Sequence, residues 1–256
     1  MIICRFQWMD EINWGIVEND MVFMMEGEPY GECRKGKELC RLQDVRLLSP
    51  VKPGIMVACG LNYIGHIKEL GSSVSEEPVL FFKPPNTVTG PNEDIPYLGI
   101  TKELCYEGEL CAILKREAKS VPEEQALNYV LGYTCGNDFT AKDLWPDKDK
   151  HITRAKGFDN SGALGPFIVT DLDPHNLNIR SKINGKLKQD ANTNEMVFGV
   201  KKLLSYVSSF LTLQPGDVIW TGTPTGGLCP VNIGDVIEVE IEGIGTLRNE
   251  IVKSPR

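Results

Sequence analysis

The sequence lacks the marks of several large classes of proteins. No apolar run is long enough to cross a membrane, and residues 1–10 show neither the basic start nor the long apolar segment of a secretory signal. There is no basic stripe, and the formal net charge of −8 at pH 7 argues against electrostatic binding of nucleic acids or anionic membranes. No fixed repeat and no low-complexity segment is present. We therefore expect a folded protein with no nucleic-acid or membrane partner.

Ligands for soft metals are also scarce. The chain has three histidines, and its eight cysteines form no C-x-x-C pair, so the spacing gives no indication of a structural zinc site. Several cysteines lie within apolar, strand-like runs, as reduced thiols of a protein core do. Reduced thiols are typical of cytoplasmic proteins, and we expect a cytoplasmic location.

Hydrophobic patterning indicates two parts of unequal size. Residues 14–17 and 21–24 are short apolar runs on either side of a polar segment, which is typical of a β-hairpin. Two prolines and a glycine within residues 50–54 interrupt the pattern. We predict a small β-rich N-terminal domain over residues 1–52 and a larger domain over residues 53–256. Further on, the apolar positions of residues 201–211 predict one amphipathic helix.

Three acidic residues are the strongest candidates for a site. Glu107 and Glu109 open an apolar run, and successive side chains of a strand alternate, so both carboxylates would share one face. Asp138 ends a second strand-like run, which we expect beside the first. Carboxylates this close repel unless a cation or a proton separates them, and oxygen ligands alone favour Mg²⁺, Mn²⁺ or Ca²⁺. A solvated edge strand is the alternative, although the apolar run indicates a buried strand end, where uncompensated charge is costly.

His66 and Glu69 form a second candidate group. They are three residues apart, so a short helix would hold them on one face within hydrogen-bonding reach. A carboxylate beside an imidazole makes it a better base near neutral pH, whereas a solvated loop histidine is the alternative. Glycine and serine flank the segment, as in lids that cover a site.

Two lysines and one loop complete the candidates. Lys83 ends an apolar strand-like run and either reaches solvent or lies near an anionic ligand. Lys156 is either a structural counter-ion or a cation that stabilises an oxyanion. Residues 222–227 are small, and they either form a plain turn or offer backbone N–H groups and hydroxyls to a carboxylate.

Several motifs, taken in the order in which they occur in the chain, resemble those of the fumarylacetoacetate hydrolase family from about residue 55 to the C-terminus. The motifs are Gly-Leu-Asn-Tyr with His66 and Glu69, Phe-Phe-Lys-Pro, Tyr-Glu-x-Glu-Leu, Gly-Tyr-Thr with Asn137 and Asp138, Arg-Ala-Lys-Gly-Phe-Asp, Pro-Gly-Asp-Val and Gly-Thr-Pro. The resemblance implies an α+β, β-rich fold, namely a mixed β roll with a small N-terminal β domain. It also implies a homodimer, as is common in the family.

The resemblance assigns expected roles to individual residues. The metal ligands would be Glu107, Glu109 and Asp138, holding Mg²⁺ or Mn²⁺, with Ca²⁺ also possible. The catalytic residues would be His66 and Glu69, as a base dyad on a mobile lid, and Lys156 beside the metal. The substrate-binding residues would be Gly222 and Thr223 of the Gly-Thr-Pro motif, Lys142 and Trp145.

Lys142 and Trp145 depart from the family pattern, which usually has arginine and glutamine there. Lys142 keeps the charge but cannot form the bidentate fork of arginine, and Trp145 would make the pocket more apolar. The resemblance implies hydrolytic cleavage of a C–C bond in a 2,4-dioxo acid through a metal-held enolate. The alternative is a decarboxylase or isomerase of 2-oxo or 2-hydroxydienoic acids, such as oxaloacetate or 2-hydroxyhepta-2,4-diene-1,7-dioate, because fold and metal do not fix the reaction. A non-catalytic β module with a structural Ca²⁺ is a third hypothesis.

Overall fold

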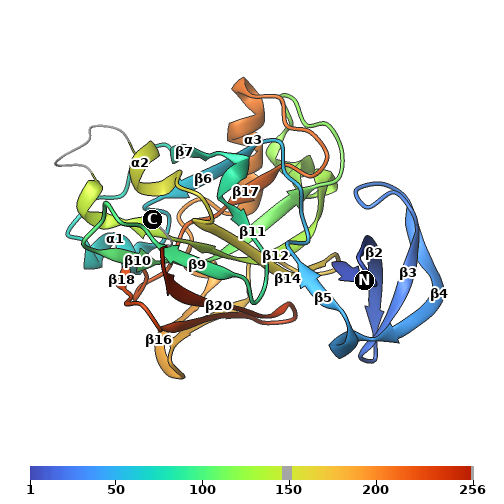
Figure 1. Ribbon diagram of the computed structural model, residues 1–256. Coiled ribbons are helices and arrows are strands. Elements are labelled where there is room, and N and C mark those ends of the chain that lie inside the picture. The colour runs from blue at the N-terminus through green and yellow to red at the C-terminus, as the bar shows by residue number, and fades with distance from the viewer. Residues whose placement is uncertain (146–151, 255–256) are drawn as a thin grey trace.

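A computed structural model describes residues 1–145 and 152–254 of the chain. In this part the chain forms three β-sheets with a few short helices between the strands (Figure 1). This arrangement confirms the predicted β-rich α+β class. No helix in the described residues is long and apolar enough to span a membrane.

The largest sheet has twelve strands and runs through the whole molecule. Its strands are β1 (Ile2–Trp8), β2 (Glu11–Glu18), β3 (Met21–Gly27), β4 (Cys33–Arg41), β5 (Arg46–Leu48), β6 (Met56–Gly60), β7 (Val79–Lys83), β8 (Val88–Thr89), β11 (Gly108–Leu114), β12 (Val130–Asp138), β14 (Gly162–Val169) and β17 (Val218–Trp220). Their main order is β4-β3-β2-β1-β14-β12-β11-β17-β6-β7, with β5 beside β1 and β8 beside β14.

Two smaller sheets and the helices pack around this sheet. The five-stranded sheet, in spatial order, consists of β16 (Lys186–Asn192), β15 (Asn178–Ile183), β19 (Val236–Ile241), β20 (Gly245–Lys253) and β9 (Asp94–Tyr97). The three-stranded sheet consists of β13 (Thr140–Ala141), β10 (Leu104–Tyr106) and β18 (Cys229–Pro230). The α-helices are α1 (Ile64–Glu69), α2 (Thr153–Lys156) and α3 (Val200–Phe210), and the 3-10 helices are η1 (Leu42–Asp44), η2 (Pro85–Thr87), η3 (Glu123–Tyr129), η4 (Lys142–Leu144) and η5 (Thr193–Glu195).

The N-terminal strands continue the large sheet instead of forming a separate one. Strand β1 pairs with β14, so that Ile2 lies opposite Val169 and Ile3 opposite Ile168. Strands β1 to β4 nevertheless project to one end of the molecule (Figure 1), and they enclose a small hydrophobic cluster of their own. The division into domains at residues 52 and 53 stays a prediction.

Strand β11 crosses the middle of the core, and both of its faces are buried. Leu110, Ala112 and Leu114 pack into one hydrophobic cluster, while Cys111 and Ile113 pack into another on the opposite face. This alternation is the two-residue period of a strand. A charged side chain at the end of such a strand has no route to solvent, so it needs partners within the protein.

Helix α3 is the predicted amphipathic helix. Its buried positions include Val200, Leu203, Leu204 and Val207, which recur every three or four residues along one face. The prediction for residues 201–211 is therefore confirmed. The helix packs against η3.

Candidate active site

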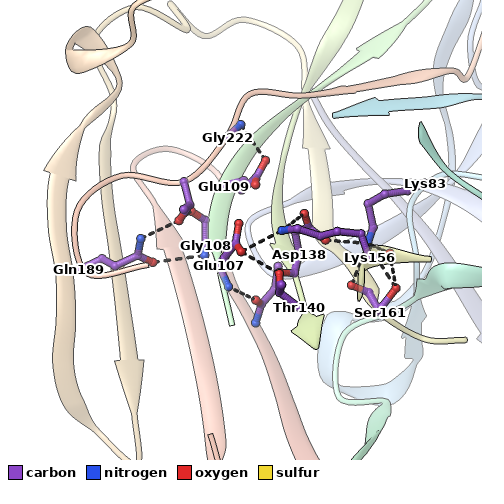
Figure 2. A network of polar contacts seen from close by, with 12 residues as sticks. Lys83, Glu107, Gly108, Glu109, Asp138, Thr140, Lys156, Ser161, Gln189 and Gly222 are labelled. Atoms are coloured by element: carbon purple, nitrogen blue, oxygen red, sulfur yellow. Dashed lines mark hydrogen bonds and ion pairs between the residues drawn. The ribbon is translucent and has the colours of Figure 1, made fainter. Parts of the chain in front are cut away.

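Glu107, Glu109 and Asp138 converge where β11 begins and β12 ends (Figure 2). The two strands are antiparallel, and the amide of Asp138 donates to the carbonyl of Glu107 at 2.9 Å. One oxygen of each carboxylate lies within 4.8 Å of the others, and all three residues are buried. The sequence prediction that the second run lies beside the first is confirmed.

Lys156 lies between two of the three carboxylates. Its Nζ donates to Glu107 Oε1 at 2.8 Å and to Asp138 Oδ2 at 2.7 Å. Burial by itself lowers the pKa of Lys156, but the two carboxylates outweigh burial and raise its pKa above the ordinary lysine value. Lys156 is therefore an ammonium ion in the folded protein. Thr140 supports the same arrangement, because its hydroxyl donates to Glu107 Oε1 at 2.7 Å.

Glu109 lies deeper than its neighbour and has a different partner. Its Oε2 accepts a hydrogen bond from the amide of Gly222 at 2.8 Å. Burial, and then the charges of Asp138 and Glu107, raise the pKa of Glu109 well above the ordinary value. Without a bound cation, a proton is therefore expected on Glu109.

The charges and the ligand types at this site fit a divalent cation. Three carboxylates and the ammonium groups of Lys156 and Lys83 give a formal charge of −3 + 2 = −1 when every group is ionised. A divalent cation would change this sum to +1, which suits a bound anion. The ligand atoms of the three residues are all carboxylate oxygens, which hard cations such as Mg²⁺, Mn²⁺ and Ca²⁺ prefer.

Lys83 is buried beside Asp138, so it does not reach solvent. Its Nζ donates to Asp138 Oδ1 at 2.6 Å and to the backbone oxygen of Lys156 at 2.6 Å. The sequence left two roles open for Lys83. The structure places it next to the acidic group, in contact with the protein's own carboxylate.

Gly222 and Thr223 lie against the strand that carries the glutamates, but the Gly222 amide and the Thr223 hydroxyl already have acceptors. The Gly222 amide donates to Glu109, and the Thr223 hydroxyl donates to the carbonyl of Gly108 at 2.9 Å. Gln189 of β16 donates to the Thr223 hydroxyl at 2.9 Å and accepts from the Gly108 amide at 3.2 Å (Figure 2). Because a hydroxyl has one proton, Thr223 has no hydroxyl donor left for a substrate in this arrangement.

The predicted dyad is present on helix α1. His66 Nδ1 lies 3.0 Å from Glu69 Oε2, and the imidazole is buried. The same carboxylate oxygen accepts from the amide of Gly226 at 3.2 Å. Helix α1 is thus joined to the loop that follows Gly222, which in turn contacts Glu109.

Lys142 and Trp145 have different environments. Lys142 Nζ forms an ion pair with Glu103 Oε1 at 2.9 Å, and about two fifths of its side chain is exposed (40%). Trp145 lies near Lys156, whose Nζ is 5.9 Å from the centre of the indole ring and 5.4 Å from the centre of the Phe81 ring. Aromatic rings at these distances attract an ammonium ion. Trp145 therefore lies close to the acidic group, whereas Lys142 is held by Glu103.

Sequence reasoning missed two supporting residues and left a third open. Thr140 lies two positions after Asp138, a spacing that would have placed it on the same side of an extended chain. Gln189 comes from the five-stranded sheet, far along the chain, and no local pattern marks it. The residue left open is Lys83, because the sequence does not show whether the end of its strand is exposed to solvent or covered by other segments.

Comparison with known proteins gives the same family over most of the chain. Residues 55–252 match the family described as Fumarylacetoacetate (FAA) hydrolase C-terminal, and residues 1–50 match one described as Rv2993c-like, N-terminal. The structure of 2-hydroxyhepta-2,4-diene-1,7-dioate isomerase from Mycobacterium marinum has 36% sequence identity, a TM-score of 0.92 and coverage of 100% of both chains.

Two relatives carry names that state an activity. The 4-hydroxyphenylacetate degradation bifunctional isomerase/decarboxylase of Salmonella dublin is 40% identical over 202 residues, which are 78% of this chain and 47% of that protein. The mitochondrial oxaloacetate tautomerase fahd2 of Xenopus laevis is 38% identical over 220 residues, 82% of this chain and 69% of that protein. Because the family match covers most of the chain and the whole fold agrees, the chain belongs to the fumarylacetoacetate hydrolase family.

Proposed function

We propose that this chain is a divalent-cation-dependent isomerase or decarboxylase of 2-oxo or 2-hydroxydienoic acids. The three proteins named above are an isomerase, an isomerase/decarboxylase and a tautomerase, which supports the alternative from the sequence over C–C hydrolysis. A solved structure named fumarylacetoacetate hydrolase, from Exiguobacterium antarcticum, is 33% identical, so hydrolysis stays among the tested reactions. These reactions share one requirement, which is to hold a 2-oxo acid or its enol and to move a proton. The observation that carries the proposal is a buried group of three carboxylates with the Nζ of Lys156 between two of them.

The carboxylates define where the 2-oxo acid binds. A divalent cation bound by Glu107, Glu109 and Asp138 would act as a Lewis acid toward the 2-oxo and carboxylate oxygens. We place Mg²⁺ or Mn²⁺ there because the three ligands are carboxylates. Lys156 supports the negative charge that develops on the 2-oxygen, since its ammonium group is preorganised and shielded from water.

His66 is the proposed base. Glu69 lies at Nδ1, so it favours the tautomer that has its proton on Nδ1 and a lone pair on Nε2. Nε2 then accepts the proton from carbon and can return it at another carbon, as double-bond isomerisation requires. Glu69 stabilises the imidazolium that forms in between.

We propose that Trp145 and Lys142 border the substrate, with Trp145 beside Lys156. The indole near Lys156 excludes water from the ammonium and adds apolar surface. Lys142, paired with the partly exposed Glu103, contributes little net charge to a ligand. The Gly222 and Thr223 segment supports Glu109 and the strand, so its contribution to substrate binding is positional.

The test is an assay of three substrates with Mg²⁺ and again after chelation. The substrates are 2-hydroxyhepta-2,4-diene-1,7-dioate, oxaloacetate and a short acylpyruvate, with all products identified. We expect metal-dependent turnover of one of the first two. His66→Gln should lower the rate at least about 100-fold, while His175→Gln, which changes an exposed histidine, serves as the matched control and should not.

Two outcomes would overturn the proposal. If only the acylpyruvate is consumed and gives pyruvate and a free acid, the hydrolytic activity expected first from the sequence is correct. If chelation lowers the melting temperature sharply and no substrate reacts, the cation is structural. The dyad of His66 and Glu69 also suits activation of water, which is why hydrolysis is included among the tested reactions.

We also propose that the protein forms a homodimer. Strand β7 is at the edge of the large sheet, and it exposes two apolar side chains, Val79 and Phe82. Exposed apolar side chains on an edge strand favour association with another chain. Light scattering after size-exclusion chromatography tests this, and a monomer at micromolar concentration would contradict it. The cytoplasmic location stays a prediction.

A further inference from the structure

Lys83 is a buried cation whose contacts join two parts of the site. Only 1% of its surface is exposed. Its Nζ contacts Asp138 Oδ1 and the Lys156 backbone oxygen, each at 2.6 Å, and it also lies 3.2 Å from the hydroxyl and 3.3 Å from the backbone oxygen of Ser161. Burying an ammonium ion is costly unless every proton has an acceptor. The fold meets this cost with acceptors from three different segments.

The protein provides a narrow space for the lysine side chain. Gly162 lies opposite Asp138 in the pairing of β14 with β12. A Cβ at Gly162 would lie 2.9 Å from Lys83 Cε and 3.1 Å from Thr87 Oγ1. Any larger residue at position 162 would therefore displace the lysine.

The two oxygens of Asp138 have different partners. Oδ1 accepts from Lys83, and Oδ2 accepts from Lys156, which also contacts Glu107. In Figure 2, Lys83 lies beyond Asp138, on the side away from the two glutamates. Lys83 thus fixes Oδ1 of Asp138, which faces away from the glutamates. The other oxygen, Oδ2, faces the space between Asp138 and the two glutamates.

We propose that Lys83 is a positioning residue, which orients Asp138 so that Oδ2 faces Glu107 and Glu109 and which fixes the backbone at Lys156. One buried ammonium then sets the geometry of both a cation ligand and the lysine beside it. The inference rests on the proposed function for the reaction, but cation binding tests it separately. Partners of this kind, which hold a ligand without touching the metal, typically affect metal affinity about 10- to 100-fold.

The sign of the effect separates positioning from simple charge neutralisation. If Lys83 were only a counter-ion, its removal would make the site more negative, and cations would bind more tightly. If it positions Asp138, its removal lets the carboxylate rotate, and cations bind more weakly. Gly162→Ala provides an independent check, because it displaces the lysine side chain without changing any charge.

The experiment measures the Kd of Mn²⁺ from the electron paramagnetic resonance signal of the free ion. We expect Lys83→Met and Gly162→Ala each to raise this Kd about tenfold or more. The control is Lys182→Met, which removes a half-exposed lysine paired with Glu240 at 3.9 Å. It should change the Kd less than about twofold, as surface substitutions usually do.

The Kd comparison can fail independently of the proposed reaction, because it needs no substrate turnover. An unchanged or lower Kd in Lys83→Met would overturn the positioning role. If that variant does not fold, Gly162→Ala decides, and an unchanged Kd there would overturn the inference. If the wild type binds Mn²⁺ but converts no substrate, the proposed reaction fails while the Kd comparison still tests Lys83. Where turnover is measurable, kcat should fall more than KM rises.

Discussion

The backbone amide of Gly226 donates to Oε2 of Glu69 at 3.2 Å. This bond joins α1, which carries His66, to the loop that begins at Gly222 and supports Glu109. The proposed base and the acidic group are thus connected through one short loop. Changes that separate α1 from this loop are expected to affect turnover more than stability.

Gly65→Ala is the most direct way to separate them. A Cβ on Gly65 would overlap the hydroxyl oxygen of Thr225, so either Thr225 or α1 must move. We expect kcat to fall about tenfold to 100-fold, because small displacements of a catalytic group have effects of this size. Steady-state kinetics measure this change. Gly199→Ala is the control, since a Cβ there meets nothing within 4 Å, and equal kcat values in both variants would contradict the prediction.

Glu109→Gln is predicted to change how stability depends on pH in protein kept metal-free with a chelator. Burial and two neighbouring carboxylates raise the pKa of Glu109 in the folded state well above its value in the unfolded chain. The folded protein therefore binds this proton more tightly than the unfolded chain does. The proton's contribution to the free energy of unfolding is fully present below the unfolded pKa and is lost as the pH rises through the raised pKa of the folded state. Glutamine resembles the protonated form and removes this loss.

Urea unfolding at several pH values measures the effect. At neutral pH, Glu109→Gln should exceed the wild type in metal-free stability, and this difference should disappear at low pH, where the wild-type carboxyl is protonated in both the folded and the unfolded state. Glu250→Gln, at an exposed position, should follow the wild-type curve. Parallel curves for Glu109→Gln and the wild type would show that Glu109 is ionised without a cation.

Gln189→Ala is predicted to destabilise the protein although the residue lies outside the group of carboxylates. It would leave the buried Gly108 amide without its side-chain acceptor, whereas the Thr223 hydroxyl would lose a donor but keep its bond to the Gly108 carbonyl. Unsatisfied buried polar groups cost about 1–3 kcal/mol each, so we expect a loss of at least about 1 kcal/mol in the free energy of unfolding. Gln43→Ala, at an exposed position, is the control. Equal unfolding midpoints for the two variants would show that water replaces the side chain.

The cysteines are predicted to fall into two reactivity classes. Burial raises the pKa of Cys4, Cys59, Cys105 and Cys135 to about 12, so their thiolates are rare at neutral pH. The half-buried cysteines should react first with iodoacetamide; they are Cys33, Cys40 and Cys229. Mass spectrometry of the folded and the denatured protein tests this. Fast labelling of Cys59 in the folded protein would show that β6 opens readily.

Local sequence was sufficient for the acidic group because strands have a short period. The alternation of apolar residues after Glu109 predicted a buried strand, and the position of Asp138 at the end of a second such run predicted the third ligand. The spacing of His66 and Glu69 likewise predicted their contact, since residues three apart on a helix are neighbours. The amphipathic pattern of α3 was equally local.

Strand parity does not show what holds Glu107 and Glu109 in place. The strand breaks at Glu107, between β10 of the three-stranded sheet and β11 of the large sheet. The chain changes sheets there, and Lys156 and Gly222, which come from different segments, hold the two carboxylates. A one-dimensional pattern contains no information about such a change of sheet.

Sequence alone predicted the residue types of the candidate site, namely three carboxylates, a His–Glu pair and Lys156. The folded arrangement was needed to show which donors are already in use: Gly222 and Thr223 hold the strand, and Lys142 pairs with Glu103. It also decided that Lys83 is buried against Asp138. The reason is physical, because burial and hydrogen-bond partners depend on segments far apart in the chain, whereas residue type and periodicity do not.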